Sequence, residues 1–279
     1  MTRAAPSKSI GQLAISIILI AAGFLMIFPF LWIFSTSLRP AMESFKLPPA
    51  LFPTRYDWKN YAYVFEAVPF FHFFLNSLKI ALFITAGQLV TCATAAYAFA
   101  RLQFPGRTAL FLLLLSGLMI PSQVTIIPLF ITIKNLGWMD THASLIVPAL
   151  VNPFGIFLLR QYMMTIPKEL EEAARVDGAS RFRIFWNIMM PIAAPAAAVV
   201  AVFTFIGSWN NFFGPLLFLN TYEKMTLPLG LTILQGYMGN GNPSAILAGV
   251  MMSIVPVLLF YIFSQKYLIE GTTLGSIKG

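Results

Sequence analysis

The sequence predicts an all-α polytopic membrane protein with six transmembrane helices, and two observations support that prediction. Hydrophobic residues make up 58% of the chain and charged residues only 10%, which lies well outside the composition of an ordinary soluble domain. Long stretches contain no Asp, Glu, Lys or Arg, and several of them match the ~20 residues that cross a bilayer. The single cysteine, Cys92, excludes a disulfide framework within the chain.

The first helix is expected at 11–36. It follows Arg3 and Lys8 as a secretory signal core would, but its apolar run is far longer than the ~7–15 residues of such a core. The last two helices come from apolar runs that exceed one span, which we divide at the polar segments 219–225 and 236–244. We expect one membrane domain over 1–279, with its remaining helices at 76–100, 108–131, 142–162, 187–213 and 245–266.

The distribution of lysine and arginine predicts the orientation of these helices. With the N-terminus in the cytoplasm, eleven of the eighteen basic residues lie on the inner side and six on the outer side, four of them in one long loop. Lys79 lies at the outer end of the second helix. Both termini and the charged loop 165–187 are therefore expected in the cytoplasm, and the net charge of +8 reflects topology rather than nucleic-acid binding.

Residues for catalysis, metal binding or proton transfer are missing from the pattern. No Asp or Glu lies within the six predicted helices, so the sequence offers no intramembrane proton relay. His72 and His142 are far apart and have no Cys or carboxylate at ligand spacing, which argues against a metal site. Without a GxxxxGK[ST] loop or a nucleophile and base, we expect neither an enzyme nor a bound cofactor, and the protein must be either passive or driven from outside by a partner.

One segment concentrates charge in this apolar chain. Residues 168–191 read KELEEAARVDGASRFRIFWNIMMP, with eight charged side chains between 168 and 183. Pro167 and the acidic residues after it favour a helix start, Gly178 favours its end, and Ser180 can cap a second helix toward Asn187. On the first helix one face holds Leu170, Ala173, Ala174 and Asp177. These residues alone fit a docking helix for another protein and an interfacial amphipathic loop equally well.

The same segment resembles the EAA loop of ATP-binding-cassette importer permeases, EAA-x3-G-x9-I-x-L-P. The matching residues are Glu172, Ala173, Ala174, Gly178, Ile188, Met190 and Pro191, with Met190 standing for the usual Leu. Further matches cover a core of 70–279: NSL at 76–78, AAYAFARLQFPGR at 95–107, IPKELEEAARVDGAS at 166–180, SWNNF at 208–212 and GTTLGSIKG at 271–279. Together they resemble the carbohydrate-uptake group, specifically the six-helix, maltose-permease G-like subunit.

This resemblance implies a heteromeric importer in the inner membrane of a prokaryote. Its other parts would be a second permease, two cytoplasmic ATPase subunits that bind ATP and Mg, and an extracytoplasmic solute-binding protein. The charged segment would be the coupling helix: Ala173 and Ala174 would pack in an ATPase groove, Glu172 and Asp177 would fix the loop, and Gly178 would allow the turn. Closure of the ATPases would then drive alternating access by rigid-body motion of the helices.

The substrate pathway is predicted at Trp209, Asn210 and Asn211, because an aromatic face with amide groups suits a sugar ring and its hydroxyls. Packing between membrane helices is the ordinary alternative for these residues. The absence of carboxylates from the helices favours a neutral carbohydrate over a charged solute. A permease for glycerol phosphate or another small solute is the alternative within the family, and a secondary transporter or channel is the alternative outside it.

Overall fold

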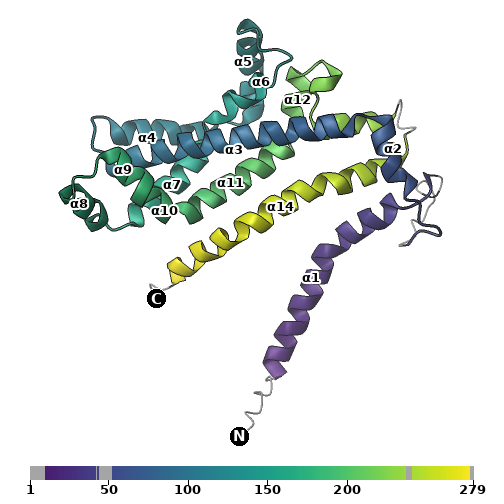
Figure 1. Ribbon diagram of the computed structural model, residues 1–279, viewed down its shortest axis with the longest axis horizontal. Helices are drawn as coiled ribbons and strands as arrows, with labels where there is room; N and C mark the ends of the chain where they lie inside the picture. Colours follow the sequence, from purple (N-terminus) through teal and green to yellow (C-terminus); the bar gives the residue numbers. More distant parts are fainter. Residues whose placement is uncertain (1–9, 42, 44–51, 237–240, 277–279) are drawn as a thin grey trace. The chain divides into compact units, whose positions relative to one another are not determined.

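The structure, a computed structural model, describes residues 10–41, 43, 52–236 and 241–276, and within them it is helical without any strand (Figure 1). The described residues form two compact units, one within Met1–Val68 and Leu231–Met252 and one within Pro69–Gly230 and Ser253–Gly279. The longer helices are α1 (Ile10–Ser37), α2 (Lys59–Ala67), α3 (Phe70–Arg101), α4 (Arg107–Ser116), α5 (Ser122–Asn135), α7 (Pro153–Thr165), α8 (Glu169–Val176), α11 (Ala194–Trp209) and α14 (Pro243–Ser276).

Short helical turns connect them. These are η2 (Gly117–Met119), α6 (Ala143–Ile146), η3 (Pro148–Leu150), α9 (Arg181–Ile184), the π-turn η4 (Phe185–Met189), α10 (Met190–Ile192), α12 (Phe213–Phe218), η5 (Tyr222–Lys224), α13 (Leu227–Leu231) and η6 (Thr232–Gln235). Pro191 and Pro195 each remove a backbone donor around α10, which accounts for the break between α10 and α11. The charged segment thus reaches α11 through three short turns rather than through the straight helix expected from 187.

Four helical stretches are long and apolar enough to cross a membrane, and this makes the chain a polytopic membrane protein. They are Gly11–Ser37, Phe70–Arg101, Ala143–Thr165 and Pro243–Lys266. Two further pairs, Arg107–Met119 with Gln123–Asn135 and Arg181–Ile192 with Ala194–Trp209, pass the same criterion when each bent pair is counted as one span. The second pair bends by 76°. The described residues therefore provide four to six candidate spans, where the sequence predicted six.

Prolines explain why two of the predicted helices are interrupted. Pro121 and its preceding residue Ile120 are extended, which separates α4 and η2 from α5 where one helix was expected over 108–131. Asn152, which precedes Pro153, is also extended, and it separates η3 from α7 within the helix expected at 142–162. Each proline restricts the residue before it, and this restriction causes the breaks. The sequence prediction located the apolar segments correctly but did not include these breaks.

In the second unit α3 packs against both α7 and α11 (Figure 1). Its main core lies where these helices meet and includes the fully buried Cys92, Leu159 and Met163. Gly155 permits the close approach, because a Cβ atom there would stand 2.9 Å from the Cys92 sulfur and 3.1 Å from Val200. Cys92 is a buried free thiol, as expected. The tight packing ties these helices into one bundle, with α8 and α9 at the end where α3 finishes.

In the first unit one carboxamide joins three helix ends. The Asn60 side chain donates to the carbonyls of Ser37 and Arg39 at 2.9 and 2.8 Å, and its oxygen accepts from the Asn242 amide at 3.0 Å. Asn242 in turn caps α14 through the backbone N–H of Ser244 at 3.0 Å. The side chains of α1 are exposed along nearly its whole length, as expected for an apolar helix whose surroundings are lipid or another subunit.

Candidate functional site

The charged segment forms a short helix held between a glycine turn and a capped second helix. α8 runs over Glu169–Val176, and its C-terminal turn passes through Gly178 with φ of +80°, a conformation that costs a side-chain-bearing residue about 1–2 kcal/mol. The Ser180 hydroxyl then accepts from the backbone N–H of Arg183 at the start of α9. The predicted helix, its glycine stop and the Ser180 cap are confirmed.

A buried ion pair fastens α8 to the end of α3. The Glu171 carboxylate lies 2.7 Å from the Arg101 Nε, and the two side chains are 3% and 5% exposed. This contact has the distance of an ion pair, although its angle falls outside hydrogen-bond geometry. The Arg101 guanidinium also donates to the carbonyls of Met163, at 2.7 Å, and Ile166 beyond the end of α7. Glu171 is therefore the acidic residue that anchors the loop.

Sequence reasoning placed that anchoring role on Glu172 and Asp177, and the structure differs. Both side chains are exposed, and no hydrogen bond or ion pair connects them to the described part of the chain. The Glu171–Arg175 pair expected at i, i+4 spacing is present at 3.7 Å. Glu171 differs from Glu172 in being buried against Arg101. Which of the two is buried depends on how α8 packs against α3, and the local sequence pattern does not contain that information.

The other residues of the EAA match divide between an exposed face and the core. Ala173 is exposed, together with Leu170 and Val176, of which Val176 is 89% exposed. Ala174 and Met190 pack against the core cluster of the bundle. Ile188 is partly buried, and Pro191 is exposed on the segment that leads to α11. The helix thus keeps one face on the bundle and leaves an apolar face open.

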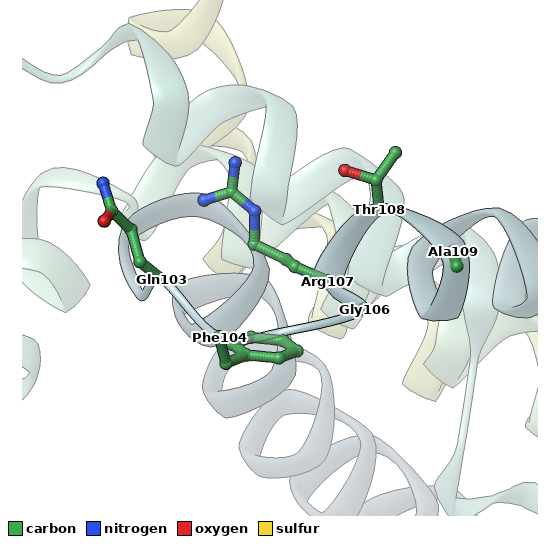
Figure 2. Close-up of a pocket in the computed structure, with 6 residues that line it drawn as sticks. All are labelled: Gln103, Phe104, Gly106, Arg107, Thr108 and Ala109. Carbon is green, nitrogen blue, oxygen red and sulfur yellow. The ribbon is translucent and has the colours of Figure 1, made fainter.

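Basic side chains surround the anchor. A cavity of about 390 Å³ beside α8 is lined by Arg101, Arg107, Lys168, Glu171, Glu172 and Arg175, with Ala100, Gln103 and Met164. Arg107 also lines a neighbouring cavity of about 380 Å³ in the loop before α4, where its guanidinium points away from Phe104 (Figure 2). The Arg107 side chain is held there by donating to the Leu102 carbonyl at 3.1 Å.

A second candidate site, called here the polar cavity, is a largely open hollow of about 300 Å³ on the bundle whose lining includes amide and hydroxyl groups. Its walls come from α3, the α6–η3 segment and α11 together with the residues after it, and they comprise Ile84, Gln88, Leu145, Ala149, Asn152, Phe203, Thr204, Gly207, Ser208 and Asn211. Gln88 joins the three walls: it donates to the Ala149 carbonyl at 2.6 Å and accepts from Asn152 at 3.0 Å and from Thr204 at 2.7 Å. Asn152 also caps α7.

The three predicted pathway residues have different positions. Trp209 is 2% exposed, donates to the Ser253 carbonyl at 3.1 Å and packs against Phe205 and Phe74, so it holds the bundle together in this conformation. Asn210 is exposed just beyond α11, whose end at Trp209 precedes the predicted 213. Asn211 lines the polar cavity.

Sequence reasoning missed Gln88 and Asn152, the two residues that organise this cavity. The search of the predicted spans considered ionisable groups only, so neutral amides such as Gln88 and Asn152 were not identified. A signal was nevertheless available, since Asn152 immediately precedes Pro153 and an Asn–Pro pair is typical of a helix start. Gln88 is an isolated amide in an otherwise apolar stretch of α3.

Outside the spans, Asp140 joins the loops at the other end of the bundle. Its carboxylate accepts from the Thr221 hydroxyl, from the backbone N–H groups of Thr221 and Asn220, and from the Lys224 ammonium at 2.9 Å. These bonds, that from the Thr221 hydroxyl first, hold the pKa of Asp140 well below its usual range. Burial lowers the pKa of His142, whose ring contacts the Lys224 carbonyl.

Comparison with known proteins identifies the family. Residues 93–269, which include the charged loop and the part of the polar cavity that follows α3, match the family of binding-protein-dependent transport system inner membrane components. The chain belongs to this family. Within it, the chain is a permease subunit of the carbohydrate type of ABC importer, as the sequence predicted, and its relatives are transport permeases rather than enzymes.

Individual relatives agree with this assignment. The chain is 39% identical to the arabinooligosaccharides transport system permease protein AraQ of Halalkalibacterium halodurans, over 92% of both chains. It is 30% identical to the sn-glycerol-3-phosphate transport system permease protein UgpE of Yersinia pestis, over 91% of this chain and 93% of that one. A crystal structure of a bacterial ABC transporter involved in the import of the acidic polysaccharide alginate matches with a TM-score of 0.81 and 25% identity, covering 94% and 99% of the two chains.

Proposed function

We propose that this chain forms, with a second permease, the translocation pathway of an ATP-driven importer for a neutral oligosaccharide. Two ATPase subunits, which bind ATP and Mg, would dock on α8 from the cytoplasm, and an extracytoplasmic binding protein would deliver the sugar. In this arrangement each bent helix pair forms one span, the chain crosses the inner membrane six times, and 1–279 is a single permease domain with its core at 70–279.

The anchored but exposed helix α8 carries this proposal. An apolar face with Leu170, Ala173 and Val176 is open on a short charged helix, and such a face suits the groove of a partner protein. The opposite side is held by the Arg101–Glu171 pair at the end of α3, and the chain continues through α9 and α10 into α11. A displacement of α8 by the ATPases would therefore reach two helices of the bundle, as rigid-body alternating access requires.

Two observations support a neutral sugar as the substrate. The similarity to AraQ, at 39% and 34% identity in two organisms, exceeds the 30% identity to UgpE. In addition, no charged side chain lines the polar cavity between α3 and α11, whereas a phosphate would need a compensating charge away from water. Import of glycerol phosphate or another small solute is the second candidate, which the likeness to UgpE favours.

Reconstitution tests the proposal. The chain is purified with its second permease, its ATPase subunits and its binding protein, placed in proteoliposomes, and supplied with labelled arabinotriose. We expect uptake that requires hydrolysable ATP, survives an uncoupler, and is inhibited by unlabelled arabinotriose at far lower concentration than by glycerol 3-phosphate. Uptake that does not require ATP and is abolished by the uncoupler would instead identify a secondary transporter. Stronger inhibition by glycerol 3-phosphate than by arabinotriose would identify the second candidate, a permease for glycerol phosphate or another small solute.

A further inference from the structure

We propose that the polar cavity between α3 and α11 is a saccharide-binding subsite that this subunit itself contributes, in which Gln88, Asn152 and Asn211 donate amide N–H groups to the hydroxyl oxygens of one sugar unit. The inference rests on the proposed function and deepens it, because it names the ligand chemistry and the residues on this chain. The subsite includes Asn211 and leaves out Trp209 and Asn210, which do not line the cavity.

The hydrogen bonds of the cavity leave donors free. An amide NH₂ group carries two hydrogens. The Gln88 amide uses one on the Ala149 carbonyl, and the Asn152 amide uses one on Gln88, so each keeps a second N–H without an acceptor among the described residues. Asn211, which is exposed, accepts from the Gly214 N–H through its oxygen, and its NH₂ donates to none of the residues that the structure describes. The cavity therefore presents donors in excess of acceptors.

The cost of such donors argues for a ligand rather than for packing alone. The Ser208 hydroxyl is buried without a partner in the described part of the chain, and such a group is unfavourable until it finds one. Gln88, on the facing wall, is 8% exposed and uses one of its two N–H groups on the Ala149 carbonyl. Gln88 lies near the middle of α3, far from either membrane surface in the proposed arrangement. Unused donors at that depth are satisfied when a solute with many oxygen acceptors enters.

The shape and chemistry of the walls favour a single neutral sugar unit. The volume of about 300 Å³ lies at the lower end of the ~300–1,000 Å³ range of small-molecule sites, which suits one ring rather than a whole oligosaccharide. Phe203, Ile84 and Leu145 supply apolar surface for the ring, and the amides supply donors for its hydroxyls. None of the lining residues is charged, so a phosphorylated or carboxylated unit would enter without a counter-charge.

The cavity opens along one side of α11. Phe203, Gly207 and Asn211 follow one another at intervals of four residues, and Phe203 is 64% exposed. A Cβ atom at Gly207 would meet no atom within 4 Å, so the described residues leave open space beside Gly207. A solute that moves along the exposed face of α11 would therefore reach the amides directly.

Matched substitutions test the subsite in the reconstituted complex. Asn211→Asp keeps the acceptor for Gly214 and the size of the side chain but removes both donors. Gln88→Glu keeps the acceptor for Asn152 and Thr204 but also loses the bond to the Ala149 carbonyl and places a carboxylate at a buried position. Loss of one such hydrogen bond is worth about 1–1.5 kcal/mol, so Asn211→Asp should lower ATP-driven uptake of arabinotriose about tenfold at saturating binding protein, and Gln88→Glu by at least as much. Asn135→Asp, the same change at an exposed residue at the end of α5 and outside the cavity, should stay within twofold.

A second measurement reads occupancy directly and does not depend on transport. In a chain with Cys92→Ser, Asn211→Cys is labelled with a small methanethiosulfonate, and excess arabinotriose should slow labelling at least fivefold while glycerol 3-phosphate should not. Unchanged uptake by Asn211→Asp and Gln88→Glu, or labelling that arabinotriose does not slow, overturns the subsite and leaves the proposed importer standing. Protection by glycerol 3-phosphate alone overturns the neutral sugar, and loss of ATP-driven uptake by the wild-type complex overturns the proposed function itself.

Discussion

Replacing Arg101 by methionine should release α8 from the end of α3. The Arg101–Glu171 pair is buried, with 5% and 3% of the side chains exposed, so solvent screens it little. Removing one member of a buried pair leaves the other charge uncompensated, at a cost of about 3–5 kcal/mol. The carbonyls of Met163 and Ile166 lose their donor as well. Taking ~3 kcal/mol, the population with α8 detached should rise on the order of a hundredfold.

Cysteine accessibility measures this population. Ala174 packs against the core cluster in the docked loop, so Ala174→Cys in a Cys92→Ser chain reacts with a thiol reagent mainly when α8 detaches. We expect Arg101→Met to accelerate labelling about a hundredfold. Glu169→Gln is the matched control, since Glu169 lies on the same helix with its side chain exposed, and exposed substitutions stay within about ±0.5 kcal/mol.

A double substitution separates the ion pair from general damage. Arg101→Met together with Glu171→Met replaces both charges by apolar side chains of similar length, which is often neutral at buried pairs. Labelling should therefore slow again, to within about tenfold of the wild-type rate, although the two carbonyls stay without their donor. Wild-type labelling of the Arg101→Met chain, or a double variant that labels faster than either single variant, would refute the role assigned to this pair.

Three further outcomes are expected. Gly178→Val should insert into the membrane normally yet lose ATP-driven uptake, because φ of +80° costs a branched side chain roughly 1–2 kcal/mol or more; normal uptake would contradict this. Asp140 has a depressed pKa in the folded chain, so its contribution to stability is present above its unfolded pKa of about 4 and lost as the pH falls below it; Asp140→Asn should remove that acid-dependent part of thermal unfolding curves. Cysteines at Ser180 and Thr54 should be labelled from the cytoplasm and from outside respectively, and outside labelling of Ser180 would exclude ATPase docking at α8.

The apolar segments could be predicted because a membrane helix requires about 20 apolar residues and little else, and this is visible in any window of the sequence. The breaks were harder. The bend at α10 coincides with two prolines, Pro191 and Pro195, whereas prolines such as Pro29 and Pro256 lie inside intact helices. Proline alone therefore does not predict a break, because a membrane helix can satisfy the freed backbone groups in several ways.

The candidate sites show the same division between local and tertiary information. The turn at Gly178 follows from local conformational preference and was predicted. The choice between Glu171 and Glu172 depends on which carboxylate faces Arg101, seventy residues away in the sequence, and the pattern EE contains no such information. The role of Gln88 is visible only in the folded structure, where Asn152 and Thr204, from two other segments, both donate to its amide oxygen.

The two candidate sites share the same helices, and this links the anchor to the cavity. α3 carries Gln88 and, thirteen residues later, Arg101, so the cavity wall and the ion pair lie about 20 Å apart on one helix. α11 carries the opposite wall and follows α8 through α9 and α10. A displacement of α8 would move the α3 wall through the Arg101–Glu171 pair. It would move the α11 wall through the covalent connection by α9 and α10. Loosening the pair should then leave one wall behind, so that ATP is hydrolysed while less sugar passes per ATP, and substitutions inside the cavity should lower sugar uptake without detaching α8.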